Sequence, residues 1–164
     1  LTYYEKYKKS KSDEARTFCI RTLECCVEEA GFIGTPTGLI SVEALATKVK
    51  KAKGISYSNM ENISLEHPIT YRVLAKYCLD RKMPFSKKAF FKFWDDNLIT
   101  VHVTKQQNGM LRNLQKDFKF GDDWKKLYRK LKIILVQEPD FRKNTVRKQY
   151  GLPYIQRGRK RKVA

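Results

Sequence analysis

The sequence has few of the residues that build metal centres and disulfide frameworks. It contains two histidines, His67 and His102, and four cysteines, none of them in a C-x2-C pair. A structural zinc site needs four closely spaced Cys or His ligands, so this composition argues against one. Cys19 and Cys26 fall on the apolar face of one predicted helix. We therefore expect buried, reduced thiols and an intracellular, reducing compartment, either cytoplasmic or nucleoid or nuclear.

Long apolar runs are also missing. No stretch approaches the roughly 20 apolar residues that a membrane-spanning helix needs. The opening residues, LTYYEKYKKSKSDE, lack the apolar centre of a signal peptide. We therefore expect no membrane partner. The phosphate-binding loop GxxxxGK[ST], the dinucleotide motif GxGxxG and the hydrolase motifs HExxH and GxSxG are absent as well, so the enzyme classes that carry them are not indicated.

Acidic residues are scarce relative to basic ones. The chain has 17 Asp and Glu against 35 Lys and Arg, which gives a formal net charge of +18. Residues 141–164 contain nine of these cations and no acid. Cations that neutralise phosphates release condensed counterions, so such a segment predicts salt-sensitive binding of nucleic acid, with DNA favoured over RNA. A merely solvated tail is the competing interpretation, but the rest of the chain is basic too.

The residues predicted to contact nucleic acid are basic side chains of this tail and of one helix. They are Arg142, Lys143, Arg147, Lys148, Arg157, Arg159, Lys160, Arg161, Lys162, Lys87 and Lys88.

Hydrophobic periodicity predicts a mainly α fold of the α+β class, a helical domain with a small antiparallel β element and a basic C-terminal tail. The predicted helices cover 13–30, 41–53, 68–82, a short segment after Ser86, and 122–138. The predicted strands are 61–67 and 98–104, with a loop at 34–38 and a tight turn at Asn108-Gly109. The expected divisions are a polar basic arm at 1–12, a single domain at 13–140 and the tail at 141–164. The expected core residues are Phe18, Leu23, Leu74, Phe90, Phe93, Trp94, Trp124 and Leu131.

One short motif suggests chemistry. Glu66 and His67 close a predicted strand, and Asn108 follows the next strand. A histidine that is neutral near pH 7 can act as a general base on water. A carboxylate and an amide oxygen are ligands that Mg²⁺ accepts. These residue types are compatible with metal-assisted phosphodiester cleavage, although an adjacent Glu-His pair is also common at the surface.

This order of residues resembles the HNH (ββα-metal) endonucleases, particularly the small phage-type members, over residues 62–112. The resemblance implies that His67 is the catalytic base, that Glu66 and Asn108 bind one divalent cation such as Mg²⁺, and that the protein is an endonuclease. The sequence departs from the family pattern because Glu replaces the commoner Asp at position 66. The central Asn or His of the family has only Asn97 and His102 as counterparts.

Two non-catalytic interpretations compete with the nuclease. Residues 44–63 resemble a helix-turn-helix, with Gly54 at the turn and Ser56, Tyr57 and Asn59 opening the recognition helix. Residues 70–104 and a hairpin over 98–112 could instead form a winged helix. A structural RNA-binding protein is a further alternative, because high lysine content and basic tails are typical of that class. The aromatic residues lie mostly at core periodicities, which does not favour an exposed platform for stacking bases.

The first prediction concerns the tail. Deleting residues 156–164 removes five cations, and each lost phosphate contact should flatten the slope of log K against log salt by about 0.9 on duplex DNA. A salt titration of DNA affinity measures this slope. An unchanged slope would show that these cations are solvated and do not contact phosphate.

Overall fold

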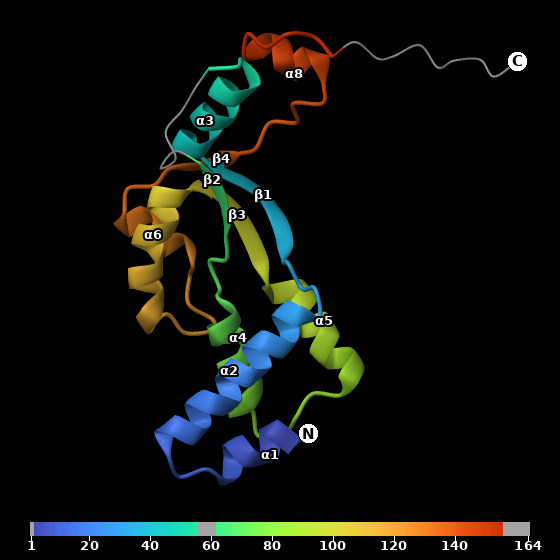
Figure 1. The fold of residues 1–164 in the computed structure, drawn as a ribbon, viewed down its shortest axis with the longest axis vertical. Helices are drawn as coiled ribbons and strands as arrows, with labels where there is room; N and C mark the ends of the chain where they lie inside the picture. The colour runs from blue at the N-terminus through green and yellow to red at the C-terminus, as the bar shows by residue number, and fades with distance from the viewer. Residues whose placement is uncertain (1, 56–61, 156–164) are drawn as a thin grey trace, which may run out of the picture.

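The structure, a computed structural model, describes residues 2–55 and 62–155 and combines helices with one small mixed sheet (Figure 1). The predicted mainly α fold of the α+β class is confirmed. Helices α1 and α8 lie at opposite ends of the long axis, and the sheet lies between them. Within the described residues, no helix is long and apolar enough to cross a bilayer.

The N-terminal segment is a packed helix and not an arm. Helix α1 (Thr2–Lys9) lies against α2 (Asp13–Glu29) and α4 (Tyr71–Asp80). Tyr7 is buried, and its hydroxyl lies 2.5 Å from a carboxylate oxygen of Asp80. The predicted polar arm is therefore wrong for residues 2–9. The lysines made this segment look polar in the sequence, but its aromatic side chains pack against α2 and α4.

The sheet has the strand order β2-β3-β1-β4. Its strands are β1 (Thr35–Ser41), β2 (Ile63–Glu66), β3 (Ile99–Thr104) and β4 (Leu135–Gln137). β3 pairs antiparallel with β2 and parallel with β1, and β1 pairs antiparallel with β4. The predicted strands 61–67 and 98–104 correspond to β2 and β3.

Two strands were not predicted. β1 covers residues 35–38 of the expected loop, and a register irregularity between Pro36 and Ile40 accommodates Gly38 with a φ of +70°. β4 covers the end of the expected helix 122–138. Lys132 adopts a left-handed φ of +56°, which ends the helix, and Leu135 then pairs with Ser41. Both errors have one cause: partner strands distant in the sequence decided the local conformation.

Two predicted helices have the expected N-terminal caps. α3 (Val42–Ala52) begins after Ser41, whose hydroxyl accepts the Ala44 N–H, and α5 (Lys87–Asn97) begins after Ser86. α4 begins later than predicted, because Thr70, and not Pro68, precedes its first turn and caps it.

Residues after β3 form a helix, where the sequence predicted a hairpin turn. α6 (Lys105–Leu114) starts with a capping box in which Thr104 and Gln107 satisfy each other's backbone N–H groups. Gln107 is buried, and its side chain also contacts Ser41 at 2.6 Å and Glu43 at 2.8 Å. The Asn108-Gly109 turn and the wing of the winged-helix interpretation are therefore wrong, since the cap and the burial of Gln107 outweigh the turn preference.

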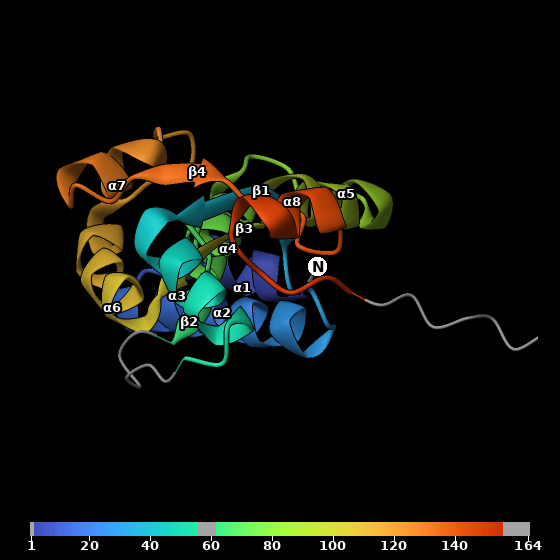
Figure 2. The same cartoon turned by 90° about the horizontal axis from the view of Figure 1, so that it is seen from above.

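The remaining elements are short. The 3-10 turn η2 (Gln115–Asp117) follows α6, and α7 (Lys125–Lys130) replaces the long helix expected at 122–138. α8 (Asn144–Gln149) lies in the predicted tail. Seen from above, α6 and α7 lie together on one side of the sheet and α5 lies on the other (Figure 2).

The buried apolar residues form two clusters. The first joins α1, α2, α4 and α5 around Leu74, Cys78 and Trp94. The second joins one face of the sheet, through Val101 and Val103, to α6 and α7. The molecule therefore has two halves: a helical half built around the first cluster and a sheet half built around the second.

The predicted core is right at its centre and wrong on one face of α2. Leu74 and Trp94 are fully buried, whereas Phe18 is 62% exposed. Cys19 and Cys78 are buried as free thiols, but Cys26 is exposed. The other predicted core residues, Leu23, Phe90, Phe93, Trp124 and Leu131, are half-buried at the edges of the clusters.

The second prediction compares two aromatic residues. Trp94→Ala should lower the free energy of unfolding by about 3–5 kcal/mol, because it leaves a large cavity. Phe18→Ala should change it by about 0.5 kcal/mol or less, because the ring is largely in solvent. Denaturant melts monitored by circular dichroism measure both values. Equal losses in the two variants would mean that Phe18 is buried in solution, in an interface that the structure of a single chain does not show.

Candidate nucleic-acid interface

Glu66 is a buried carboxylate at the end of β2. It is 2% exposed, and its two oxygens accept hydrogen bonds from the Tyr128 hydroxyl and the Gln115 amide. Burial raises the pKa of Glu66 to about 7, although the hydrogen bonds from Tyr128 and Gln115 lower it. Burial, together with the Glu66 charge, raises the pKa of Tyr128 in turn. Both acceptor oxygens are engaged inside the protein.

His67 has different neighbours. It follows β2 directly, and its ring lies edge-on against Tyr71, 5.1 Å between centroids. A Cβ on Gly34 would lie 3.2 Å from the ring, so this glycine makes room for it. Burial lowers the pKa of His67, while a backbone hydrogen bond with Ile99 raises it by less. Its Nδ1 atom is buried and has no hydrogen-bond partner among residues 2–55 and 62–155.

Asn108 lies on the first turns of α6 and donates to the Ser64 hydroxyl at 2.9 Å. Ser64 and Glu66 share one face of β2, separated by about 6.6 Å along the strand. The structure thus brings Asn108 toward β2, but each of the three groups is held by different neighbours: Asn108 by Ser64, Glu66 by Tyr128 and Gln115, and His67 by Tyr71.

The described residues also show no alternative cluster of metal ligands. Among them, no three His, Cys, Asp or Glu side chains lie together in a way that could hold a metal ion. Asn97, which stood for the central residue of the HNH pattern, donates its amide to the Phe93 carbonyl at the end of α5. Its side chain therefore stabilises a helix end.

His102 belongs to a charged cluster that the sequence did not indicate. Its Nδ1 atom lies 2.6 Å from one oxygen of Glu138, and the ammonium group of Lys48 pairs with the other oxygen. Burial alone would raise the pKa of Glu138, but the hydrogen bonds from Lys48 and His102 outweigh it and lower the pKa. The three residues come from α3, β3 and the end of β4, so no local sequence pattern could reveal them.

The first half of the predicted tail is folded. Arg147 donates to the carbonyls of Pro153, at 2.5 Å, and Phe141, and Leu152 is buried. Arg142 pairs with Asp140. Lys143 and Lys148 are exposed, as are Lys87 and Lys88 on α5. Arg147 therefore links two parts of the backbone of the 141–155 segment, and its contact with nucleic acid stays a prediction.

Several predicted contacts lie outside the described residues. These are the five tail cations Arg157, Arg159, Lys160, Arg161 and Lys162, and the recognition residues Ser56, Tyr57 and Asn59 of the helix-turn-helix interpretation.

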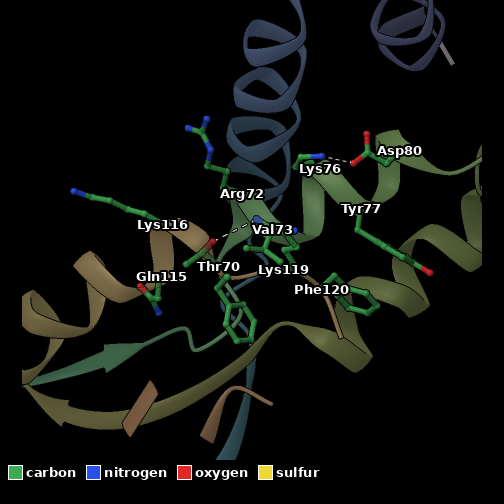
Figure 3. A pocket seen from close by; sticks show the side chains of 11 residues that line it. Thr70, Arg72, Val73, Lys76, Tyr77, Asp80, Gln115, Lys116, Lys119 and Phe120 are labelled. Carbon is green, nitrogen blue, oxygen red and sulfur yellow. Dashed lines mark hydrogen bonds and ion pairs between the residues drawn. The ribbon is translucent and has the colours of Figure 1, made fainter. Parts of the chain in front are cut away.

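A groove between α4 and residues 115–120 gathers cations and aromatic rings that the sequence did not single out (Figure 3). Its volume is about 530 Å³. α4 contributes Arg72, Lys76 and Tyr77 from one side. Lys116, Phe118, Lys119 and Phe120 come from the other side. In the close view, the Arg72 and Lys116 side chains extend away from the ribbon, and the Tyr77 and Phe120 rings lie near each other.

Among the residues that the structure describes, some of the cations around this groove pair with acids and others do not. Lys76 pairs with Asp80, the acid that lines the groove, at 2.5 Å. Glu24 on α2 is close enough to Arg72 for the guanidinium to lower the pKa of Glu24, although burial raises that pKa more. The ammonium groups of Lys116 and Lys119 have no ion-pair or hydrogen-bond partner within the described part of the chain. These two lysines are free to bind an anion.

A weak signal for the groove was present in the sequence. The segment QKDFKFGDD alternates cations with phenylalanines between residues 115 and 123. Its acids obscure the pattern, but Asp122 accepts the Lys119 backbone N–H and Asp123 pairs with Arg129. The contribution of α4 could not be read in this way, because tertiary packing sets which helix faces the segment.

Comparisons with protein-family models, with curated protein sequences and with solved structures returned no match. The residues themselves must therefore carry the functional argument.

The third prediction concerns Glu66. Because the folded-state pKa is raised from about 4.5 to about 7, the folded protein binds a proton that the unfolded chain releases in this range. Relative to Glu66→Gln, the wild type should lose stability as the pH rises from about 4.5 to about 7, by about 3 kcal/mol in total. His67 contributes with the opposite sign, but its effect cancels in the difference between the two proteins.

Urea melts of both proteins at several pH values measure this difference. Tyr128→Phe serves as the second variant: it removes a donor to the carboxylate, so the window should move to higher pH. A stability difference that stays constant from pH 4 to pH 8 would contradict the raised pKa.

Proposed function

We propose that this protein binds nucleic acid through phosphate contacts of its basic surface, centred on the groove between α4 and residues 115–120. The observation that carries the proposal is the convergence there of Arg72, Lys76, Lys116 and Lys119 around one acid that is already paired. The formal charge of +18 supports it, because a polyanion would neutralise that excess. DNA remains the favoured partner from the sequence, and no membrane partner is proposed.

The geometry supports binding better than metal-dependent cleavage. In an HNH-type site, the acid and the base must address one metal and one water. Here Glu66 is bonded to Tyr128, whereas His67 packs against Tyr71. Asn108 is engaged with Ser64. A nuclease using His67, Glu66, Asn108 and Mg²⁺ would require β2 and α6 to rearrange before the three groups could meet.

The fourth prediction tests the groove by charge removal. The double variant Lys116→Gln/Lys119→Gln should flatten the slope of log K against log salt by about 0.7 to 0.9 for each lost phosphate contact. The matched variant Lys87→Gln/Lys88→Gln removes the same charge from α5, outside the groove, and should change the slope less. Fluorescence anisotropy with a labelled oligonucleotide gives both slopes.

Two results would contradict the proposal. Equal flattening in both double variants would mean that the charge acts diffusely and that the groove is not the centre of the interface. Nicking of plasmid DNA that requires Mg²⁺, Mn²⁺ or Ni²⁺ and disappears in His67→Ala would favour the nuclease instead. In that case the His67 variant should keep its DNA affinity, since a general base acts in the transition state.

A further inference from the structure

The groove contains more than cations, and its apolar floor limits which ligand fits it. Tyr77, Phe118 and Phe120 line it together with the four basic residues. A site that only held the phosphates of a duplex would need no aromatic floor, because the bases of a duplex are stacked inside the helix. Aromatic side chains combined with basic ones are typical of sites for unpaired bases.

Two of the aromatic rings that line the groove, Tyr77 and Phe120, are held in place by packing against Phe93. The Tyr77 and Phe120 rings lie 4.1 Å apart between centroids, and both pack against Phe93, at 5.3 Å and 5.4 Å. Tyr77, Phe118 and Phe120 are each half-buried, so part of every ring remains open to the groove. A floor fixed in this way loses little side-chain entropy when a ligand binds.

The opposite wall is fixed by the buried carboxylate. Gln115 lines the groove, and its amide donates to Glu66 and, at 2.9 Å, to the His67 carbonyl. These bonds anchor the start of the 115–120 segment to the end of β2. Lys116 and Lys119 are therefore displayed from a positioned backbone and not from a free loop.

The size of the groove agrees with a single nucleotide. Its volume of about 530 Å³ lies in the range of about 300–1,000 Å³ that holds small organic ligands. The aromatic rings that line it provide an apolar part, and the Arg72 and Lys116 side chains provide a cationic part. A base with its flanking phosphates has the matching two parts.

We propose that the groove binds single-stranded nucleic acid, with an unpaired base against Tyr77 and Phe120 and the flanking phosphates against Arg72, Lys116 and Lys119. This inference rests on the proposed nucleic-acid-binding function and adds its ligand class. A duplex then binds through phosphates alone, and a single strand gains the contact of its base with the rings.

Three probes of equal length separate these contributions: an oligothymidylate of about 16 nucleotides, the same strand with abasic sites, and a duplex. At one salt concentration, the wild type should bind oligothymidylate about five- to 100-fold more tightly than the abasic strand, which has the same phosphates. Phe120→Leu keeps an apolar side chain but removes the ring. It should lose most of this difference and keep its affinity for the duplex and the abasic strand.

Phe91→Leu is the matched control, because Phe91 is a partly exposed phenylalanine of α5 that does not line the groove. It should bind all three probes like the wild type. Thermal melts of both variants show whether each is folded. Photo-crosslinking of wild-type protein to a strand carrying 5-iododeoxyuridine needs no variant, and it should label residues 70–80 or 115–120.

The outcomes distinguish the inference from the function on which it rests. Equal affinity of the wild type for oligothymidylate and the abasic strand, or crosslinks only outside the groove, would overturn the single-strand inference and leave phosphate binding intact. A Phe120→Leu variant that loses affinity for all three probes equally would show that the ring supports the fold and does not contact a base. Failure of the wild type to bind any probe at low salt would overturn both.

Discussion

The buried hydrogen-bonded carboxylate of Glu66 is the interaction on which the arrangement of this protein depends. A carboxylate at this depth is costly unless donors satisfy it, and Tyr128 and Gln115 supply them. These donors come from α7 and η2, so the bonds fasten the edge strand β2 to the α6–η2–α7 side of the molecule. Removing one donor would leave a buried acceptor unpaired, which costs more than the bond itself contributes.

These bonds lie within the sheet half of the molecule, next to its junction with the helical half. The apolar clusters of the helical half and the sheet half bury different faces, and the groove lies where they meet, with Phe120 packed on the first and Phe118 on the second. Gln115 holds the connecting segment at β2, while Phe93 supports Tyr77 and Phe120. The candidate site is therefore made by packing between elements, as is usual for ligand sites at such junctions.

The Glu66-His67 pair illustrates how one short motif can serve two structural roles. The carboxylate at the end of β2 bonds to Tyr128 and the imidazole that follows it packs against Tyr71, so the two neighbours in sequence contact different residues. Both groups are buried, and burial shifts each pKa toward the neutral form: upward for Glu66 and downward for His67. His102 and Glu138 show the opposite case, because these residues lie 36 positions apart in the sequence but are in contact in the structure.

The sequence by itself determined the helices with clear caps, the strands β2 and β3, the burial of Leu74 and Trp94 and the basic excess, because these depend on local periodicity and composition. Only the tertiary structure decided that β1 and β4 are strands, that Asn108 lies in a helix and that Phe18 faces solvent, because distant partners set those outcomes. It likewise brought Tyr77 of α4 beside Phe120. The excess of positive charge, which predicts a polyanionic partner, follows from the composition of the chain. The groove that could bind this partner exists only because of tertiary packing.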